Sequence, residues 1–260
     1  MTAGTYRPSS KYRIQASVKD NVITGYKLTE ACVNGNMYGL IPNFFPAAAI
    51  QNYEVHAHKL ESDITIGAWR APYTNFLAFA EQSFFDELAE KIEVDPVQLR
   101  LDLLENAKSN LDEEIQYSPE RMQEVIKLVA DKANWKAKSE GVYKGFSAYY
   151  SHNTHVAEVA EVILEDDIPI VKKVNVAVDC GIVINPIAAK NQVIGGVVDG
   201  VGHAMYGEMT FEDGKPSADN FNSYRLIRMT EAPEVEVHFV DNKLSPVSYT
   251  HLTLPTICSV

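Results

Sequence analysis

Cysteine is scarce in this chain, and the few cysteines are scattered. The 260 residues include three, Cys32, Cys180 and Cys258, and none belongs to a Cys-x-x-Cys pair. An odd and sparse set argues against a disulfide framework and against a zinc ribbon. It also argues against an iron–sulfur cluster held by this chain, because such a cluster needs four clustered ligands.

Positive charge is scarce as well. Lys and Arg total 23 against 35 Asp and Glu, which gives a formal net charge of −12, and no basic cluster offsets it locally. An acidic surface repels phosphate backbones, so we expect no nucleic-acid partner.

Long hydrophobic runs are absent from the sequence. No run of about 18 apolar residues occurs, so we expect no membrane segment in this chain. Met1 is followed by polar, turn-rich sequence and not by the apolar core of a signal peptide. If the chain is a fragment, its parent begins upstream, and the sequence leaves both a cytoplasmic and a periplasmic location open.

Most of the sequence shows the residue patterns of strands and helices. Apolar residues make up 46% of the chain, which is enough for a packed core. Pairs of a capping residue and a proline mark three helix starts, at Asp95-Pro96, Ser118-Pro119 and Asn185-Pro186. Alternation predicts strands at 11–19, 22–33, 53–60, 145–151, 156–165, 170–178 and 235–240, and a hairpin from 209. The capping pairs and apolar residues that share one helical face predict helices at 74–92, from 96, 118–135 and 185–207. This order predicts an α+β fold of mixed antiparallel strands and helices.

Four glycines, Gly195, Gly196, Gly200 and Gly202, fall within the last expected helix. They do not form a dinucleotide fingerprint, which needs G-x-G-x-x-G directly after a strand. Two interpretations stay open. The glycines allow close helix packing at a cost of about 1 kcal/mol each relative to alanine, or they allow a bound cofactor to approach the backbone closely.

Two histidine pairs raise the question of a metal site. His56 and His58 are two apart on an expected strand, so both imidazoles project from one face. No third ligand is evident nearby, and the same holds for His152 and His155. A metal-dependent enzyme built on His56 and His58 is one interpretation of the chain, and structural histidines are the simpler one.

A tight turn precedes the first expected helix. Trp69, Arg70 and Ala71 lie there between Gly67 and Pro72. Exposed backbone N–H groups and an arginine just before a helix suit an oxyanion or a phosphate. The alternative is a simple loop with a structural arginine.

Four stretches together resemble one enzyme family. They are GTYRPSSKY at 4–12, GAWRAP at 67–72 followed by FAEQSFFDE at 79–87, VDCG at 178–181 through NP at 185–186 to QVIGG at 192–196, and NF at 220–221 through Tyr224 and Arg228 to PEVEV at 233–237. In order and spacing they resemble the xanthine dehydrogenase / aldehyde oxidase family of molybdenum hydroxylases over nearly all of residues 1–245. In particular, the chain resembles molybdopterin-binding subunits of the isoquinoline 1-oxidoreductase beta-subunit type.

The resemblance implies a cofactor and the residues that hold it. In such proteins the cofactor is a molybdenum ion held by a pyranopterin, often as the cytosine dinucleotide. The implied cofactor contacts are Trp69, Arg70, Ala71, Gln192, Gly195 and Gly196. Phe221 and Tyr224 are implied to line the approach of the substrate.

The implied chemistry is hydroxylation of an aldehyde or an N-heterocyclic carbon with water as the oxygen source. A glutamate acts as general base, and electrons leave through iron–sulfur clusters. Because this chain has no cluster cysteines, the resemblance implies a small iron–sulfur partner subunit, with a cytochrome as one candidate acceptor.

The family's glutamate lies in a Gly-Glu-Pro motif shortly after the strand expected at 235–240, and the sequence departs from the family there. After Ser245-Pro246 it continues as VSYTHLTLPT at 247–256. That string is the translation of GTC TCT TAT ACA CAT CTG ACG CTG CCG ACG, a DNA sequence that resembles a transposase-type sequencing-library adapter read in one frame. We hypothesise that residues 246–260 are translated adapter, and the alternative is a divergent natural tail. A genomic amplicon spanning codon 247 that encodes the same tail would exclude the adapter.

The sequence therefore predicts that residues 1–245 are a partial molybdopterin-binding domain. The fragment is expected to be inactive alone, because no residue of the chain matches the catalytic glutamate. The non-enzymatic alternative is an α+β ligand-binding or structural domain.

Overall fold

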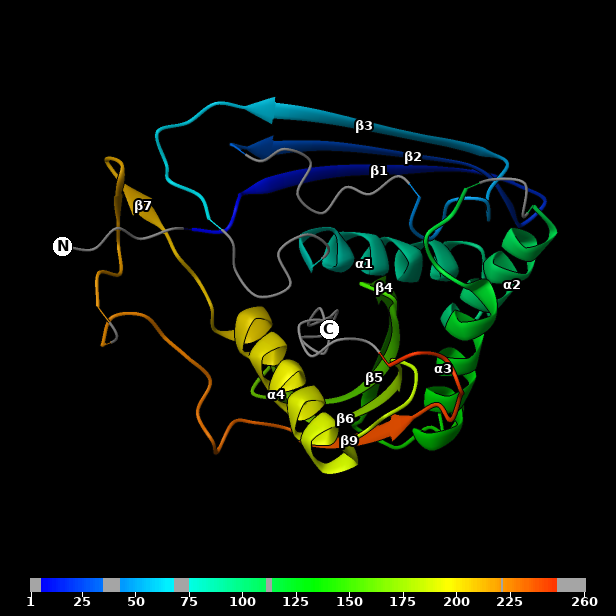
Figure 1. Cartoon of the computed structure of the whole chain (residues 1–260). Helices are drawn as coiled ribbons and strands as arrows, with labels where there is room; N and C mark the ends of the chain where they lie inside the picture. The colour runs from blue at the N-terminus through cyan, green and yellow to red at the C-terminus, as the bar shows by residue number, and fades with distance from the viewer. Residues whose placement is uncertain (1–5, 35–42, 68–74, 111–113, 221, 247–260) are drawn as a thin grey trace.

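The structure is a computed structural model of the chain, and it describes residues 6–34, 43–67, 75–110, 114–220 and 222–246 (Figure 1). Its strands are β1 (Ser10–Lys19), β2 (Val22–Val33), β3 (Asn52–Leu60), β4 (Tyr143–Ser151), β5 (Thr154–Glu165), β6 (Ile168–Asp179), β7 (Phe211–Glu212), β8 (Lys215–Pro216) and β9 (Glu234–Phe239). Its helices are α1 (Asn75–Lys91), α2 (Pro96–Ser109), α3 (Pro119–Lys132) and α4 (Pro186–Met205). None of the helices in these ranges combines the length and the apolar character that crossing a membrane requires.

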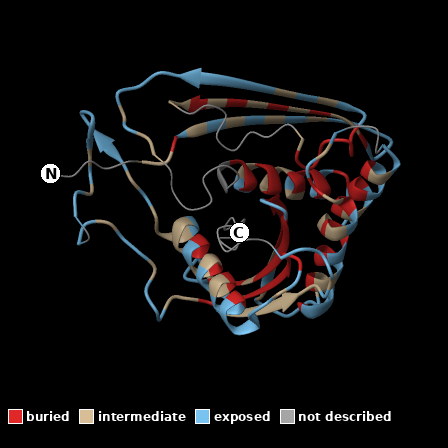
Figure 2. Ribbon diagram, viewed as in Figure 1, coloured by how far each residue is buried: buried red, intermediate tan, exposed pale blue. Residues whose placement is uncertain are grey.

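The first sheet contains β1, β2 and β3 in that order. The β1–β2 turn places Asp20 and Asn21 at φ of 51° and 58°, a left-handed conformation that Asp and Asn tolerate well. Inward side chains of β2 pack against α1, where the rings of Tyr26 and Phe85 stack with centroids 6.0 Å apart. The outward side chains of β1 and β3 are exposed to solvent, as Figure 2 shows.

Capping side chains fix where α2 and α3 begin. The Asp95 carboxylate accepts hydrogen bonds from the backbone N–H groups of Val97 and Gln98, each at 3.0 Å. The Ser118 hydroxyl accepts one from the backbone N–H of Arg121 at 3.3 Å. Each cap satisfies backbone donors that have no partner inside the helix, so both helices start where the sequence predicts.

The second sheet has the order β4-β5-β6-β9 and is covered on both faces. α3 packs against β5 and β6 from one side, and α4 lies on the other side (Figure 1). Because side chains alternate along a strand, β6 directs Val174, Val176 and Val178 toward α4 and Ala177 toward α3. Double coverage explains why β5 and β6 are buried over much of their length (Figure 2).

The predicted α+β class is confirmed, whereas the pairing of two strands differs from an all-antiparallel arrangement. β2 pairs with β3 in parallel, and β6 pairs with β9 in parallel. Parallel neighbours need a long crossover, and α4 lies in the connection between β6 and β9. The alternation of apolar residues is the same in both pairing directions, so the sequence pattern could not distinguish them.

Candidate functional site

α4 carries three of the residues that the sequence predicts to contact a cofactor. The Asn185 side chain fixes its start by accepting a hydrogen bond from the backbone N–H of Ala188 at 3.1 Å. One side of the helix is buried against the second sheet through Ala189, Val193, Val197 and Val201. The remaining side of α4 is therefore left for contacts with something other than the sheet.

The predicted residues Gln192, Gly195 and Gly196 lie together on that remaining side. Residues three and four apart share a helix face, so Asp199 and His203 continue the same row. Gly195 and Asp199 are exposed, and the other three are half-buried. We call these five residues the α4 face. Sequence reasoning missed Asp199 and His203, although their helical spacing from Gln192 was a signal that could have found them.

The structure separates the two interpretations of the glycines. A Cβ added at Gly202 would lie 3.0 Å from Cγ2 of Ile227, so this glycine serves close packing. A Cβ added at Gly195 would meet no atom of the described residues within 4 Å. Packing therefore does not explain Gly195, and its contact with a cofactor stays a prediction.

Tyr224, predicted to line the substrate approach, lies near the C-terminal end of α4. A Cβ at Gly207 would come within 3.2 Å of Tyr224 Oη and 3.0 Å of His203 Nδ1. The absence of a side chain at Gly207 thus allows the phenol and the imidazole to lie near the same point of the backbone. Tyr224 is thereby placed at the His203 end of the α4 face.

Arg7 adds a positive charge to this end of the α4 face. Burial lowers the pKa of Arg7, whereas the neighbouring Asp199 and Tyr224 raise it. Burial also lowers the pKa of His203, with Asp199 acting in the opposite direction and Arg7 in the same direction, so the imidazole is mostly neutral near pH 7. Asp199 Oδ2 lies 3.7 Å from His203 Nε2. A guanidinium beside a neutral imidazole suits an anionic or polar ligand.

The predicted turn at 69–71 lies outside the described residues, but its approach is described. The backbone N–H of Gly67 donates to the carbonyl oxygen of Tyr6 at 3.0 Å, and Tyr6 immediately precedes Arg7. Gly67 therefore lies beside the N-terminal segment whose Arg7 is close to Asp199. Trp69, Arg70, Ala71 and Phe221, together with the segment 247–260, are not among the described residues. Their predicted roles stay predictions.

The histidine pairs do not form a metal site in the described part of the chain. His56 contacts the Glu54 carboxylate on the exposed side of β3. The described residues contain no group of three or more His, Cys, Asp or Glu placed to hold a metal ion. His155 is buried, burial lowers its pKa to about 3, and its Nε2 accepts a hydrogen bond from the backbone N–H of Ser118 at 3.0 Å. His155 is therefore a neutral structural residue.

Comparison with known proteins agrees with the predicted resemblance. The molybdopterin cofactor-binding domain family matches residues 77–233. The chain is 30% identical to the beta subunit of isoquinoline 1-oxidoreductase from Brevundimonas diminuta, in a match that covers 96% of the chain and 33% of that protein. It is 24% identical over 189 residues to a nicotinate dehydrogenase subunit of Pseudomonas putida, covering 65% of the chain and 15% of that protein. The chain thus spans a third or less of the length of these relatives.

Solved structures share the fold at low sequence identity. Quinoline 2-oxidoreductase from Pseudomonas putida 86 matches with a TM-score of 0.74 and 9% identity, over 97% of the chain and 58% of that protein's chain. The aldehyde oxidoreductase from Desulfovibrio gigas matches with a TM-score of 0.66 and 13% identity, over 97% and 46%. The whole α4 face and Tyr224 fall inside the family match at 77–233. The chain belongs to the molybdopterin cofactor-binding domain family.

Proposed function

We propose that the chain is the cofactor-binding part of a molybdenum hydroxylase large subunit. Its intact parent would hydroxylate an aldehyde or an N-heterocyclic carbon, with water as the oxygen source. The observation that carries the proposal is the α4 face, which lies inside the family match and places Gln192 next to open space at Gly195. Electrons would leave through a small iron–sulfur subunit, because the chain has only three scattered cysteines.

The α4 face fits a pyranopterin by its chemistry. The Gln192 amide offers both donors and an acceptor to a ring that is rich in nitrogen and oxygen. Gly195 and Gly196 bring no side chain between the ligand and the helix backbone. Arg7, close to Asp199, supplies positive charge suited to the phosphate of such a group. The cytosine dinucleotide form of the pyranopterin, which the resemblance implies, is the form that we propose the chain binds.

The other predicted residues would complete the site. Trp69, Arg70 and Ala71 would present backbone groups and a guanidinium to the cofactor, and Phe221 and Tyr224 would line the path of the substrate. When bound, the molybdenum cofactor supplies the two-electron oxidation. The described residues of this chain would bind and orient it, and the general base would come from a Gly-Glu-Pro motif that the printed sequence does not contain.

Cofactor retention by the 260-residue chain tests the proposal. The chain is expressed in a bacterium that makes the molybdenum cofactor, and the purified protein is assayed for molybdenum by mass spectrometry and for pterin by fluorescence after oxidation. We expect both to copurify with the chain and to fall several-fold in Gly195→Leu, whose side chain would fill the open space. Lys190→Leu is the matched control, because Lys190 is exposed on the same helix and is not three or four residues from any member of the α4 face.

Two results would contradict the proposal. One is a folded chain that retains neither molybdenum nor pterin. The other is a Gly195→Leu variant that retains as much of both as Lys190→Leu does. Circular dichroism of each preparation separates loss of binding from loss of folding.

A further inference from the structure

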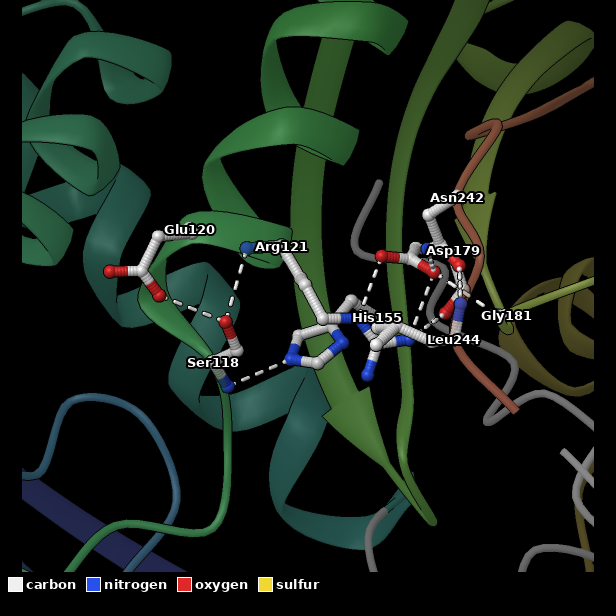
Figure 3. A network of polar contacts seen from close by, with 8 residues as sticks. All are labelled: Ser118, Glu120, Arg121, His155, Asp179, Gly181, Asn242 and Leu244. Carbon is white, nitrogen blue, oxygen red and sulfur yellow. Dashed lines mark hydrogen bonds and ion pairs between the residues drawn. The ribbon is translucent and has the colours of Figure 1, made fainter. Parts of the chain in front are cut away.

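Asp179, the last residue of β6, is the centre of a buried polar network that joins separate parts of the fold (Figure 3). Its side chain is inaccessible to solvent. Arg121, in the first turn of α3, donates from Nε to Asp179 Oδ2 at 2.7 Å and from Nη2 to Oδ1 at 2.9 Å. Arg121 Nη2 also donates to the Asp179 carbonyl oxygen at 3.1 Å. This two-point ion pair fixes the orientation of the carboxylate.

The same carboxylate holds the segment that follows β9. Asn242 donates from Nδ2 to Asp179 Oδ1, and Asn242 Oδ1 accepts a hydrogen bond from the backbone N–H of Leu244 at 3.1 Å. The amide of Asn242 is thus held at both of its polar atoms. Arg121 orients the Asp179 carboxylate, the carboxylate orients the Asn242 amide, and the amide holds the backbone at Leu244.

Gly181 allows this segment to come very close to the end of β6. Its φ is +74°, and an added Cβ would lie 2.3 Å from the carbonyl oxygen of Ser245 and 3.0 Å from that of Leu244. The backbone N–H of Ile182 donates to the Leu244 carbonyl oxygen at 3.1 Å. A side chain at Gly181 would therefore displace the segment, so the contact depends on glycine.

We propose that Asp179 and Arg121 are positioning residues, which act through Asn242 to set the path of the chain at residues 242–246. The pairing of Asp179 with His155 of β5 already holds the end of β6 in the sheet. The contacts of Arg121 with Asp179, of Asp179 with Asn242 and of Asn242 with Leu244 therefore constrain residues 242–246 rather than β6. The functional consequence rests on the proposed function, because the resemblance places the catalytic glutamate of intact relatives shortly after this segment.

Amide hydrogen exchange at Ile182 tests this inference in the full chain. Asn242→Ala removes the link and leaves both atoms of the Ile182 hydrogen bond, its N–H and the Leu244 carbonyl oxygen, in place. We expect Ile182 to exchange roughly tenfold faster, the effect of about one lost hydrogen bond, with no change at Val176 in the centre of β6. Lys243→Ala, an exposed residue of the same segment outside the network, is the matched control. Equal rates at Ile182 in Asn242→Ala and Lys243→Ala would overturn the proposal, as would a parallel rise at Val176.

A double-substitution cycle tests whether Asp179 acts through Asn242. Asp179→Asn keeps the shape of the side chain and removes its charge, and we expect Ile182 to exchange at least as fast as in Asn242→Ala. The combination of both substitutions is expected to add nothing beyond Asp179→Asn, because both break one pathway. Additive effects would overturn the inference, and Asn242→Ala alone keeps it testable if Asp179→Asn does not fold. Pterin content of the unsubstituted chain reports on the proposed function separately. A pterin-free chain with a protected Ile182 amide would contradict the proposed function but not the positioning role of Asp179 and Arg121.

Discussion

Gly195 and Gly202 are seven residues apart on α4, and the structure predicts opposite results for the same substitution. Gly195→Ala is expected to raise the free energy of unfolding by about 0.5–1 kcal/mol, because alanine favours the helix and its Cβ meets open space. Gly202→Ala is expected to be less stable than Gly195→Ala by at least about 1 kcal/mol, because its Cβ presses on Ile227. Urea unfolding measures both, and equal effects would contradict the assignment of Gly202 to packing.

Glu81 makes the stability of the fold depend on pH. Burial raises the pKa of Glu81 to about 8, against the opposing effects of the Tyr26 hydrogen bond and of Arg100. Tyr26 Oη donates to Glu81 Oε1 at 2.9 Å, whereas Oε2 is buried with no hydrogen-bond partner among the described residues. The folded state therefore holds the proton more tightly than the unfolded state does. Stability contributed by the protonated form is fully present below pH 4.5 and is lost as the pH rises toward about 8.

The contribution of Glu81 to the melting temperature is accordingly expected to fall between pH 5 and pH 8, whereas that of His155, whose pKa is lowered to about 3, rises with pH up to about 6.5. Glu81→Gln is expected to make this fall smaller, because glutamine cannot ionise. Burial also raises the pKa of Glu158 to about 8, so Glu81→Gln with Glu158→Gln should flatten the profile further. Glu90→Gln, exposed on the same helix as Glu81, is the control. Thermal unfolding followed by circular dichroism gives the profile, and identical pH dependence in Glu81→Gln and Glu90→Gln would refute the prediction.

At the scale of elements, Arg100 joins α1 to α2. Its side chain is 1% exposed, and it donates from Nε to Gln82 Oε1 and from Nη2 to the Gln82 carbonyl oxygen, each at 3.0 Å. Arg100 Nη2 lies 2.8 Å from Asp86 Oδ1. Arg100→Met is expected to lower the free energy of unfolding by about 3 kcal/mol, because it leaves the Asp86 carboxylate without its ion-pair partner and removes both Arg100 hydrogen bonds to Gln82.

Chemical denaturation checks this value against a surface arginine. Arg13 lies on the exposed side of β1, so Arg13→Met is expected to change stability by no more than about 0.5 kcal/mol. A cost for Arg100→Met as small as that for Arg13→Met would show that α1 and α2 do not depend on this contact.

At the scale of the whole molecule, the chain is expected to bind the cofactor without turning over substrate. The printed sequence contains no Gly-Glu-Pro motif and no cysteine cluster, so neither the general base nor an electron path is provided. An assay with an aldehyde, an N-heterocycle and a dye acceptor should give no rate above that of buffer. Turnover that copurifies with the chain and disappears in Gly195→Leu would contradict this expectation.

We expect residues 246–260 to be translated adapter, and only the source DNA tests this expectation. Apart from Pro246, these residues lie outside the described ranges. Residues 242–244 precede the expected adapter, so the contacts of Asn242 and Leu244 are the same whether the tail is adapter or natural sequence.

Local residue patterns were enough to predict the positions of the elements and the helix starts at Asp95, Ser118 and Asn185, and the residue types in four stretches were enough to predict the family. These features depend on residues within a few positions of one another, such as a capping side chain and the N–H groups of the next turn. The cofactor contacts of Gln192 and Gly195, which the resemblance implies from residue type and order, stay predictions.

The contacts between residues far apart in the chain could not be predicted and are seen in the folded chain. Arg7 comes near Asp199, Asp179 holds Asn242, and β3 and β9 pair in parallel with β2 and β6. The structure also separated Gly195 from Gly202, since one faces open space and the other faces Ile227. No local pattern encodes these contacts, because each depends on how segments far apart in the chain are brought together when both faces of a sheet are buried.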